Sequence, residues 1–188
     1  MPPDADQLNT ALSTDLDGTF EPLVAAHEDR LFTIALRVLG DRRDAEEAAQ
    51  DAFVRAYHAL AGYEPARIRE LRLRGWLTTI LLNVCRNRTR IRRVQTVELA
   101  FEPAVAPAVD PVARLERREA WAHLLAELPP AQRTAIVLRH VDGLSYAEMA
   151  AVLDRPEGTL KAQVHRGLAT LREALLANQR LAREELTA

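Results

Sequence analysis

The sequence contains few of the residues that cross-link a chain or shape a β-sheet protein. Of its 188 residues one is cysteine, Cys85, seven are glycine, and 5% are aromatic. A single cysteine excludes a disulfide within the chain, and no cysteine/histidine cluster has zinc spacing. Scarce glycine and aromatics disfavour a β-sandwich or barrel, whereas abundant Ala, Leu, Arg and Glu favour helices. We therefore predict an all-α protein without a metal or a cofactor.

The sequence also lacks long apolar runs and catalytic signatures. No apolar stretch approaches the length of a membrane span. The first residues, MPPDADQLNTALSTD, contain neither the basic n-region nor the apolar h-region of a secretory signal. We therefore expect a cytoplasmic protein with no membrane segment. No Ser/His/Asp order, glycine-rich phosphate loop or carboxylate pair stands out, so we do not expect an enzyme.

Charge is unevenly distributed along the chain. The 25 basic and 27 acidic residues give a formal net charge of −2, and Lys161 is the only lysine. Residues 67–93 contain nine arginines and one acid, whereas residues 21–51 contain eight acids and four arginines. Such local fields predict one surface that meets an anion and another that meets a cation.

A proline-rich acidic segment divides the chain. Pro103, Pro107 and Pro111 lie among three acids and no base, and prolines at this spacing exclude a continuous helix. We therefore predict two small helical domains joined by a flexible acidic linker. The expected boundaries are a disordered tail at 1–18, a first domain at 19–93, the linker at 94–112, a second domain at 113–177 and a C-terminal tail at 178–188.

Helix-end signals organise the acidic part of the first domain. Apolar residues recur at helical spacing over 31–38, and Gly40 suits the residue after that helix. Asp41 or Asp44 can cap the next helix, which is expected to turn Phe53 inward.

The second domain ends in a pattern typical of DNA-binding proteins. Ser145 and Glu148 have the spacing of a capping box, and RPEGTLKAQVHRGLATLREAL, residues 155–175, follows as a longer amphipathic helix. A short capped helix, a tight turn and a longer helix predict a helix-turn-helix, whose second helix enters the major groove. The polar residues near the start of that helix are Thr159, Lys161, His165 and Arg166, and Gly158 lets the backbone approach a partner closely. A helical hairpin with a solvated face is the alternative.

The arginine-rich helix of the first domain suggests a second nucleic-acid surface. Arg86, Arg90 and Arg93 recur on one side, with Arg88 and Arg92 beside them, so a basic stripe can follow phosphates. Asn83 and Asn87 are four residues apart, and their amides can read a base edge if the base is accessible. They are otherwise ordinary surface amides.

Two blocks of sequence resemble an extracytoplasmic-function (ECF, group IV) sigma factor of bacterial RNA polymerase. The first is DRRDAEEAAQDAFVRAYHAL followed by RGWLTTILLNVCRNRTR. The second is LAELPPAQRTAIVLRHVDGLSYAEMAAVLDRPEGTLKAQVHRGLATLREAL. With their flanking helices the two blocks span about three-quarters of the chain.

The resemblance implies that the first block is sigma region 2 and the second is region 4. Region 2 would bind the clamp helices of the largest polymerase subunit through Asp44, Glu47, Gln50, Asp51 and Phe53. It would capture bases of the promoter minus-ten element with Tyr63, Trp76, Asn83, Arg86, Asn87 and Arg90. Region 4 would bind the flap of the second-largest subunit and read the minus-thirty-five element with Arg139, Tyr146, Gly158, Thr159, Lys161, Ala162, His165 and Arg166.

The resemblance also implies partners and leaves alternatives. Core polymerase, promoter DNA and an anti-sigma factor are the expected partners. Ala162, Gln163 and Gly167 depart from the residues usual in the family. A stand-alone helix-turn-helix regulator would use only the second domain, and a helical adaptor would bind only protein. Neither accounts for both the acidic surface and the two basic surfaces.

Overall fold

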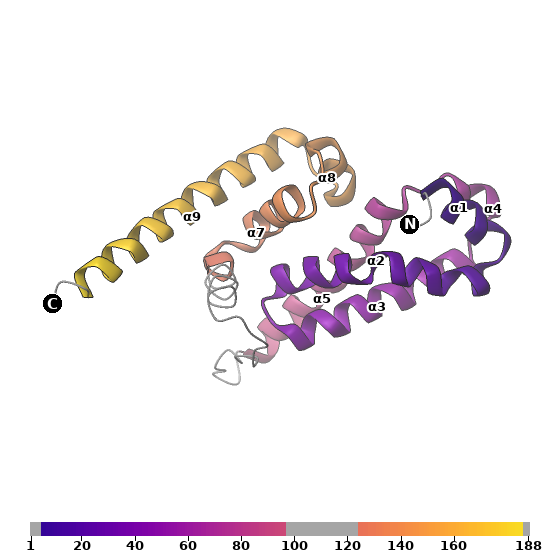
Figure 1. Cartoon of the computed structure of the whole chain (residues 1–188), viewed down its shortest axis with the longest axis horizontal. Coiled ribbons are helices and arrows are strands. Elements are labelled where there is room, and N and C mark those ends of the chain that lie inside the picture. Colours follow the sequence, from indigo (N-terminus) through magenta and orange to yellow (C-terminus); the bar gives the residue numbers. More distant parts are fainter. Residues whose placement is uncertain (1–4, 97–123, 186–188) are drawn as a thin grey trace. The chain divides into compact units, whose positions relative to one another are not determined.

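The computed structural model describes residues 5–96 and 124–185, and all of its regular elements in these ranges are helices (Figure 1). The all-α prediction is confirmed. The chain forms two compact units, Met1–Ala104 and Val105–Ala188, and their division falls within the predicted linker. The linker itself lies mostly outside the described residues.

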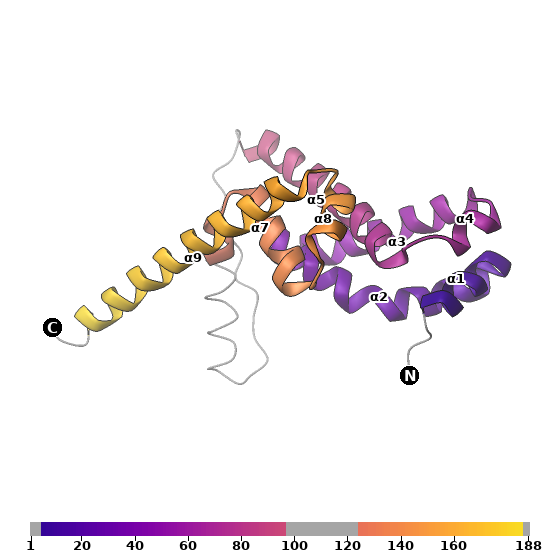
Figure 2. The same cartoon turned by 90° about the horizontal axis from the view of Figure 1, so that it is seen from above.

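The first unit is a helical bundle seen from two sides in Figures 1 and 2. Its elements are α1 (Ala5–Thr14), α2 (Leu16–Leu39), α3 (Arg42–Ala61), the short α4 (Pro65–Arg69) and α5 (Leu73–Thr96). Helices α2, α3 and α5 pack on one another, and α1 packs on α2 and α4. The largest fully buried side chains here are Leu12, Leu23, Leu31, Ile34, Leu60, Leu77 and Leu81.

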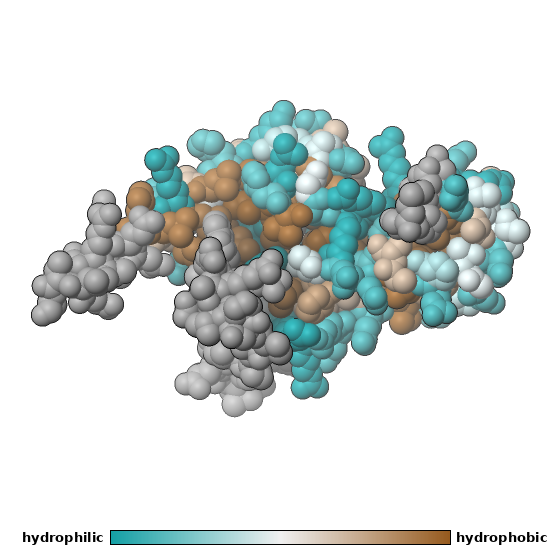
Figure 3. Space-filling view, viewed as in Figure 1, coloured by the Kyte–Doolittle hydropathy of each residue, from teal (hydrophilic) through white to brown (hydrophobic). Residues whose placement is uncertain are grey.

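The second unit contains α7 (Pro130–Ile136), the π-helical segment η1 (Val137–Val141), α8 (Tyr146–Leu153) and α9 (Glu157–Glu185). The first residues of α9 pack near α8, and α9 also packs along α7. One core cluster joins Leu124, Leu125, Leu128, Ile136 and Leu171. Figure 3 shows hydrophobic surface along the side of this unit where α7 and α9 lie.

The helix ends form as their sequences predict. Gly40 follows α2 with φ 78°, a left-handed conformation in which glycine is unstrained. The Asp41 carboxylate, not that of Asp44, caps α3 by accepting from the Asp44 amide at 2.8 Å. Ser145 and Glu148 make a complete capping box at the start of α8. These three predictions are confirmed.

The predicted tails require correction. Residues 5–14, assigned to a disordered tail, form α1, whose Leu8 and Leu12 are buried. Burial of two leucines one turn apart gives this short helix the tertiary support that it lacks in isolation. At the other end, α9 continues past residue 177 to Glu185.

Candidate protein and nucleic-acid interfaces

Polar residues of α3 form a row along its exposed side. Gln50, Asp51 and Val54 follow Glu47 by three, four and seven residues, which places all four on one side of the helix. Val54 has 56% of its surface exposed. Phe53, predicted to contact a partner, is only 8% exposed and lies in the core of the unit. The surface prediction for Phe53 is therefore corrected, and Val54 is the apolar side chain that a partner can reach.

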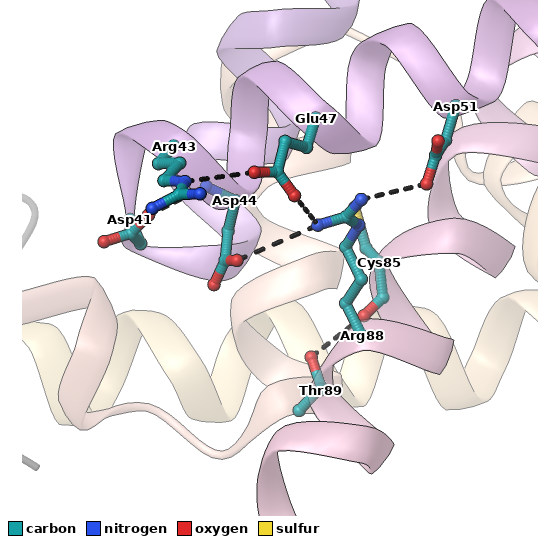
Figure 4. A network of polar contacts seen from close by, with 8 residues as sticks. All are labelled: Asp41, Arg43, Asp44, Glu47, Asp51, Cys85, Arg88 and Thr89. Atoms are coloured by element: carbon teal, nitrogen blue, oxygen red, sulfur yellow. Dashed lines mark hydrogen bonds and ion pairs between the residues drawn. The ribbon is translucent and has the colours of Figure 1, made fainter.

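Arg88 of α5 crosses to this acidic row (Figure 4). Its guanidinium donates to Glu47 Oε2 at 2.8 Å and to Asp51 Oδ2 at 2.9 Å, and it lies 3.9 Å from Asp44 Oδ1. The Arg88 side chain is only 24% exposed. Arg88 was predicted to lie beside a phosphate-binding stripe, but it faces α3 and neutralises part of the acidic surface.

Two arginines on α3 itself also pair with carboxylates of that helix. Arg42 pairs with Glu46 at 2.8 Å, and Arg43 pairs with Glu47 Oε1 at 3.1 Å. Both oxygens of Glu47 thus accept hydrogen bonds, and those from Arg88 and then Arg43 lower the pKa of Glu47. The pKa of Arg88 is raised, mainly by its bond to Glu47. The ionised forms of Glu47 and Arg88 are therefore both favoured, and the Glu47 carboxylate is held in place by its hydrogen bonds.

Replacing Arg88 with methionine is expected to raise the pKa of Glu47 toward its ordinary value of 4.5. The folded-state pKa of Glu47 lies below that value, so its contribution to stability is present above about pH 4.5 and lost as the pH falls through the folded pKa. Carboxyl titration by NMR checks the shift, and Arg43→Met should move the Glu47 pKa less. A Glu47 pKa that is the same in R88M and the wild type would contradict this account.

An aromatic cluster lies where the sequence predicts base capture. The rings of Tyr63 and Trp76 are 6.1 Å apart and tilted by 57°, and the Arg67 guanidinium stacks 3.7 Å from the Tyr63 ring centre. Trp76 and Tyr63 are both half-buried, so neither residue is fully enclosed in the core. Rings of this kind can stack on an unpaired base, and a guanidinium can add a cation–π contact.

The exposed side of α5 carries the predicted amides. Asn83, Asn87, Arg86 and Arg90 are all exposed, and Arg86 Nη1 donates to Asn83 Oδ1 at 3.1 Å. The opposite side of the helix is buried and includes Cys85, whose thiol pKa is raised to about 12 by burial. That cysteine is therefore an unreactive core residue, and α5 presents its amides from a rigid, packed helix.

Three of the residues predicted to read DNA meet in the second unit. The Arg139 guanidinium donates to the Leu144 carbonyl at 2.8 Å and lies 5.1 Å from the Tyr146 ring centre. Lys161 Nζ lies 5.5 Å from the same ring centre and 3.5 Å from a Glu157 carboxylate oxygen. Arg139 belongs to η1, so the π-helical turn, which the sequence did not reveal, helps to place it.

The remaining predicted contacts lie exposed on the first turns of α9. They are Gly158, Thr159, Ala162, His165 and Arg166. A Cβ atom added at Gly158 would meet no atom within 4 Å, so this glycine leaves open space above the helix. The start of α9 is therefore unobstructed at this position.

Neither a metal centre nor a membrane span lies within residues 5–96 and 124–185. No group of three His, Cys, Asp or Glu residues there could hold a metal ion. In the same ranges, no helix has both the length and the apolar character of a membrane span.

Comparison with known proteins decides the family. Residues 23–95 match the family model of sigma-70 region 2, and residues 118–171 match that of sigma-70 region 4. ECF RNA polymerase sigma factor SigW of Bacillus subtilis (strain 168) is 31% identical over 169 residues, which cover 83% of this chain and 88% of SigW. The chain belongs to the ECF sigma-factor family. ECF sigma factor SigE of Mycolicibacterium smegmatis is 32% identical over 164 residues, which cover 84% of this sigma factor and 62% of SigE.

A solved structure agrees with this membership. The sigma factor RpoE from Bartonella quintana, in complex with the anti-sigma factor NepR, matches this sigma factor with a TM-score of 0.69 and 28% identity. The match covers 83% of this chain and 96% of the RpoE chain. The prediction of an RNA polymerase sigma factor is confirmed.

The structure explains one residue in which this sigma factor departs from the usual pattern. Gly167 is buried where α9 crosses α7, and a Cβ atom there would lie 2.6 Å from Ile136 Cδ1. Alanine would require the Ile136 side chain to move. The departure at Gly167 thus concerns helix packing, whereas Ala162 is exposed on the candidate DNA surface.

Proposed function

We propose that this sigma factor docks on core RNA polymerase through α3 and reads promoter DNA through α5 and α9. The observation that carries the proposal is that three packed helices each present exposed polar side chains. Helices α3 and α5 do so in the first unit, and α9 does so in the second. Residues 19–93 and 113–177 would be the two binding modules. The polymerase-contacting residues are Asp44, Glu47, Gln50, Asp51 and Val54.

The first module would capture a melted strand of the minus-ten element. A base leaving the duplex can stack on Tyr63 and Trp76, and stacking on an aromatic side chain contributes about 1–3 kcal/mol per base. Asn83 and Asn87 can then bond to the edge of an unpaired base, while the exposed Arg86 and Arg90 of the same helix can bind phosphates. Strand opening follows as a shift of population toward the state that these residues bind.

The second module would read the minus-thirty-five element as duplex. The first turns of α9 would enter the major groove, with Thr159, His165 and Arg166 at base edges and Lys161 at a phosphate. A good bidentate contact to a base discriminates by about 1–3 kcal/mol. Tyr146 of α8, which Arg139 of η1 also contacts, would brace Lys161, and this unit would also meet the polymerase flap.

The proposed activity is binding in the cytoplasm, with the catalytic site supplied by polymerase. RpoE is bound to an anti-sigma factor in its solved complex. We extend that partnership to this chain and propose that an anti-sigma factor restrains it.

Run-off transcription tests the function directly. Core polymerase transcribes a library of genomic fragments with and without the chain, and sequencing of RNA 5′ ends identifies the start sites. The proposal predicts a discrete set of starts that requires the chain. Duplex binding without polymerase, together with no change in start sites, would instead support a stand-alone regulator.

Replacing Lys161 with alanine is expected to weaken duplex binding uniformly across sequences and to reduce the salt slope by about one. The reason is that a phosphate contact releases counterions when it forms. Fluorescence anisotropy of a promoter duplex recovered from the transcription experiment, titrated with core polymerase carrying wild-type or variant chain at several salt concentrations, measures the slope. Arg172→Ala, an exposed arginine further along α9, is the matched control and should leave the slope unchanged. Equal slopes for K161A and the wild type would contradict the phosphate assignment.

A further inference from the structure

Asn9 is a buried polar residue on α1, with only 5% of its surface exposed. Its amide nitrogen Nδ2 donates to the carbonyl oxygen of Leu71 at 2.6 Å and to that of Arg69 at 3.2 Å. These acceptors are about sixty residues away in sequence, at the end of α4 and in the turn before α5. A single side chain therefore ties the N-terminal helix to the chain that leads into α5.

The tethered segment has little support of its own. Helix α4 has five residues, and a helix of this length is not stable alone. Carbonyl groups at a helix end lack intrahelical partners, and Asn9 supplies donors to two carbonyls there. A second link joins Arg69 Nη1 to Ser13 Oγ at 3.3 Å, and Ile68 is buried. Figures 1 and 2 show α1 and α4 at the same end of the first unit.

The same segment carries the aromatic cluster. Tyr63 precedes α4, Arg67 lies within it, and Trp76 lies in the first turn of α5. The Arg67 guanidinium stacks on Tyr63, and Tyr63 lies against Trp76, so the cluster closes across the segment that Asn9 holds. Arg69 and Leu71, whose carbonyl groups accept from Asn9, lie between Tyr63 and Trp76 along the chain.

We propose that Asn9 is a positioning residue for strand capture: by holding the carbonyl groups of Arg69 and Leu71, it fixes the segment that presents Tyr63 and Trp76 to an unpaired base. This inference rests on the proposed function of that segment. Asn9 is buried and does not itself touch DNA. If the segment loosens, the ring pair is competent to bind for a smaller fraction of the time, and the apparent affinity for a single strand falls in proportion to that fraction.

The first experiment measures single-strand binding by the holoenzyme. Fluorescein-labelled mixed-sequence single-stranded 15-mers are titrated with core polymerase alone and with core polymerase carrying wild-type or variant chain. We expect Asn9→Ala to weaken the chain-dependent binding about five- to tenfold. Asn9→Asp, which has the same shape but places carboxylate oxygens against two carbonyls, should weaken it more. Affinity for core polymerase should stay within twofold of the wild type.

The second experiment separates positioning from general stability. In a Trp121→Phe background Trp76 is the only tryptophan, so its emission reports the ring pair in the full chain. Asn9→Ala should change that emission and speed hydrogen exchange in residues 64–72, while exchange in α2 and α3 stays unchanged. Gln7→Ala, an exposed change on the same helix, is the matched control and should alter none of these measurements.

The outcomes distinguish this inference from the proposed function. Wild-type holoenzyme that binds single strands no better than core polymerase would overturn both. Wild-type capture that persists undiminished in N9A and N9D would overturn the role of Asn9 alone. If N9A loses the whole fold, Ser13→Ala removes only the second link, and it should weaken capture in the same direction by about twofold. No change in S13A would then count against positioning through α1.

Discussion

Replacing Asp51 with lysine is expected to weaken binding of the sigma factor to core polymerase by about 100-fold. Asp51 lies in the row of α3 that we assign to polymerase, where the partner must supply cations. Reversing one charge in such a contact costs several kcal/mol, and about 3 kcal/mol corresponds to roughly 100-fold in affinity. The new ammonium would also face Arg88, the present partner of Asp51. Anisotropy of labelled chain titrated with core polymerase at physiological salt measures the loss.

Glu46→Lys is the matched control because it makes the same charge change five residues earlier on α3. Glu46 pairs with Arg42 and lies on another side of the helix from Asp51. We expect E46K to weaken polymerase binding less than fivefold. Asp51→Asn, which removes the charge without adding one, should give an intermediate loss. Equal losses for D51K and E46K would mean that only net charge matters, and the docking row would then be wrong.

The acidic row of α3 shows which structural features a sequence pattern can predict. Periodicity correctly turned Phe53 inward, and Asp41 was one of the two caps that the sequence offered for α3, because both signals depend on residues within a few turns. The distinction between Phe53 and its neighbour Val54 was within reach, because the inward-facing periodicity of α3 already placed Phe53 in the core. A pattern that turns a residue inward should therefore override its assignment to a surface contact.

Three features that the sequence did not predict differ in whether a local signal for them existed. Arg88 was grouped with surrounding arginines because its two acidic partners lie about forty residues earlier, and a charge count does not show which charges meet. Helix α1 was missed because its polar composition hides two buried leucines, Leu8 and Leu12. Their spacing of four residues, followed by the Asp15 cap of α2, was the available signal. Asn9 gave no signal, since its acceptors are backbone carbonyls.

The second large effect is expected on the stability of the helix-turn-helix, because the hydrophobic core of this unit is small. Leu160 on α9 is fully buried where the helix packs near α8. Leu160→Ala is expected to destabilise the second unit by about 2–5 kcal/mol, the range for a buried leucine whose cavity does not collapse. Amide exchange followed by mass spectrometry should show protection in α8 and the start of α9 falling by about 30-fold or more, with α2 and α3 unchanged. Duplex binding should weaken with it, since fewer molecules hold the recognition helix in place.

Leu168→Ala makes the same chemical change on the same helix, two turns further on. The sequence places Leu160 and Leu168 on one apolar face, but Leu168 is 43% exposed in the structure. Its truncation should therefore change stability by no more than about 0.5 kcal/mol, as is usual for surface substitutions. If L168A and L160A destabilised the second unit equally, the face of α9 that packs on its neighbours would be misassigned. Thr159, Lys161, His165 and Arg166 are placed relative to that face, so their assignment to DNA would fail with it.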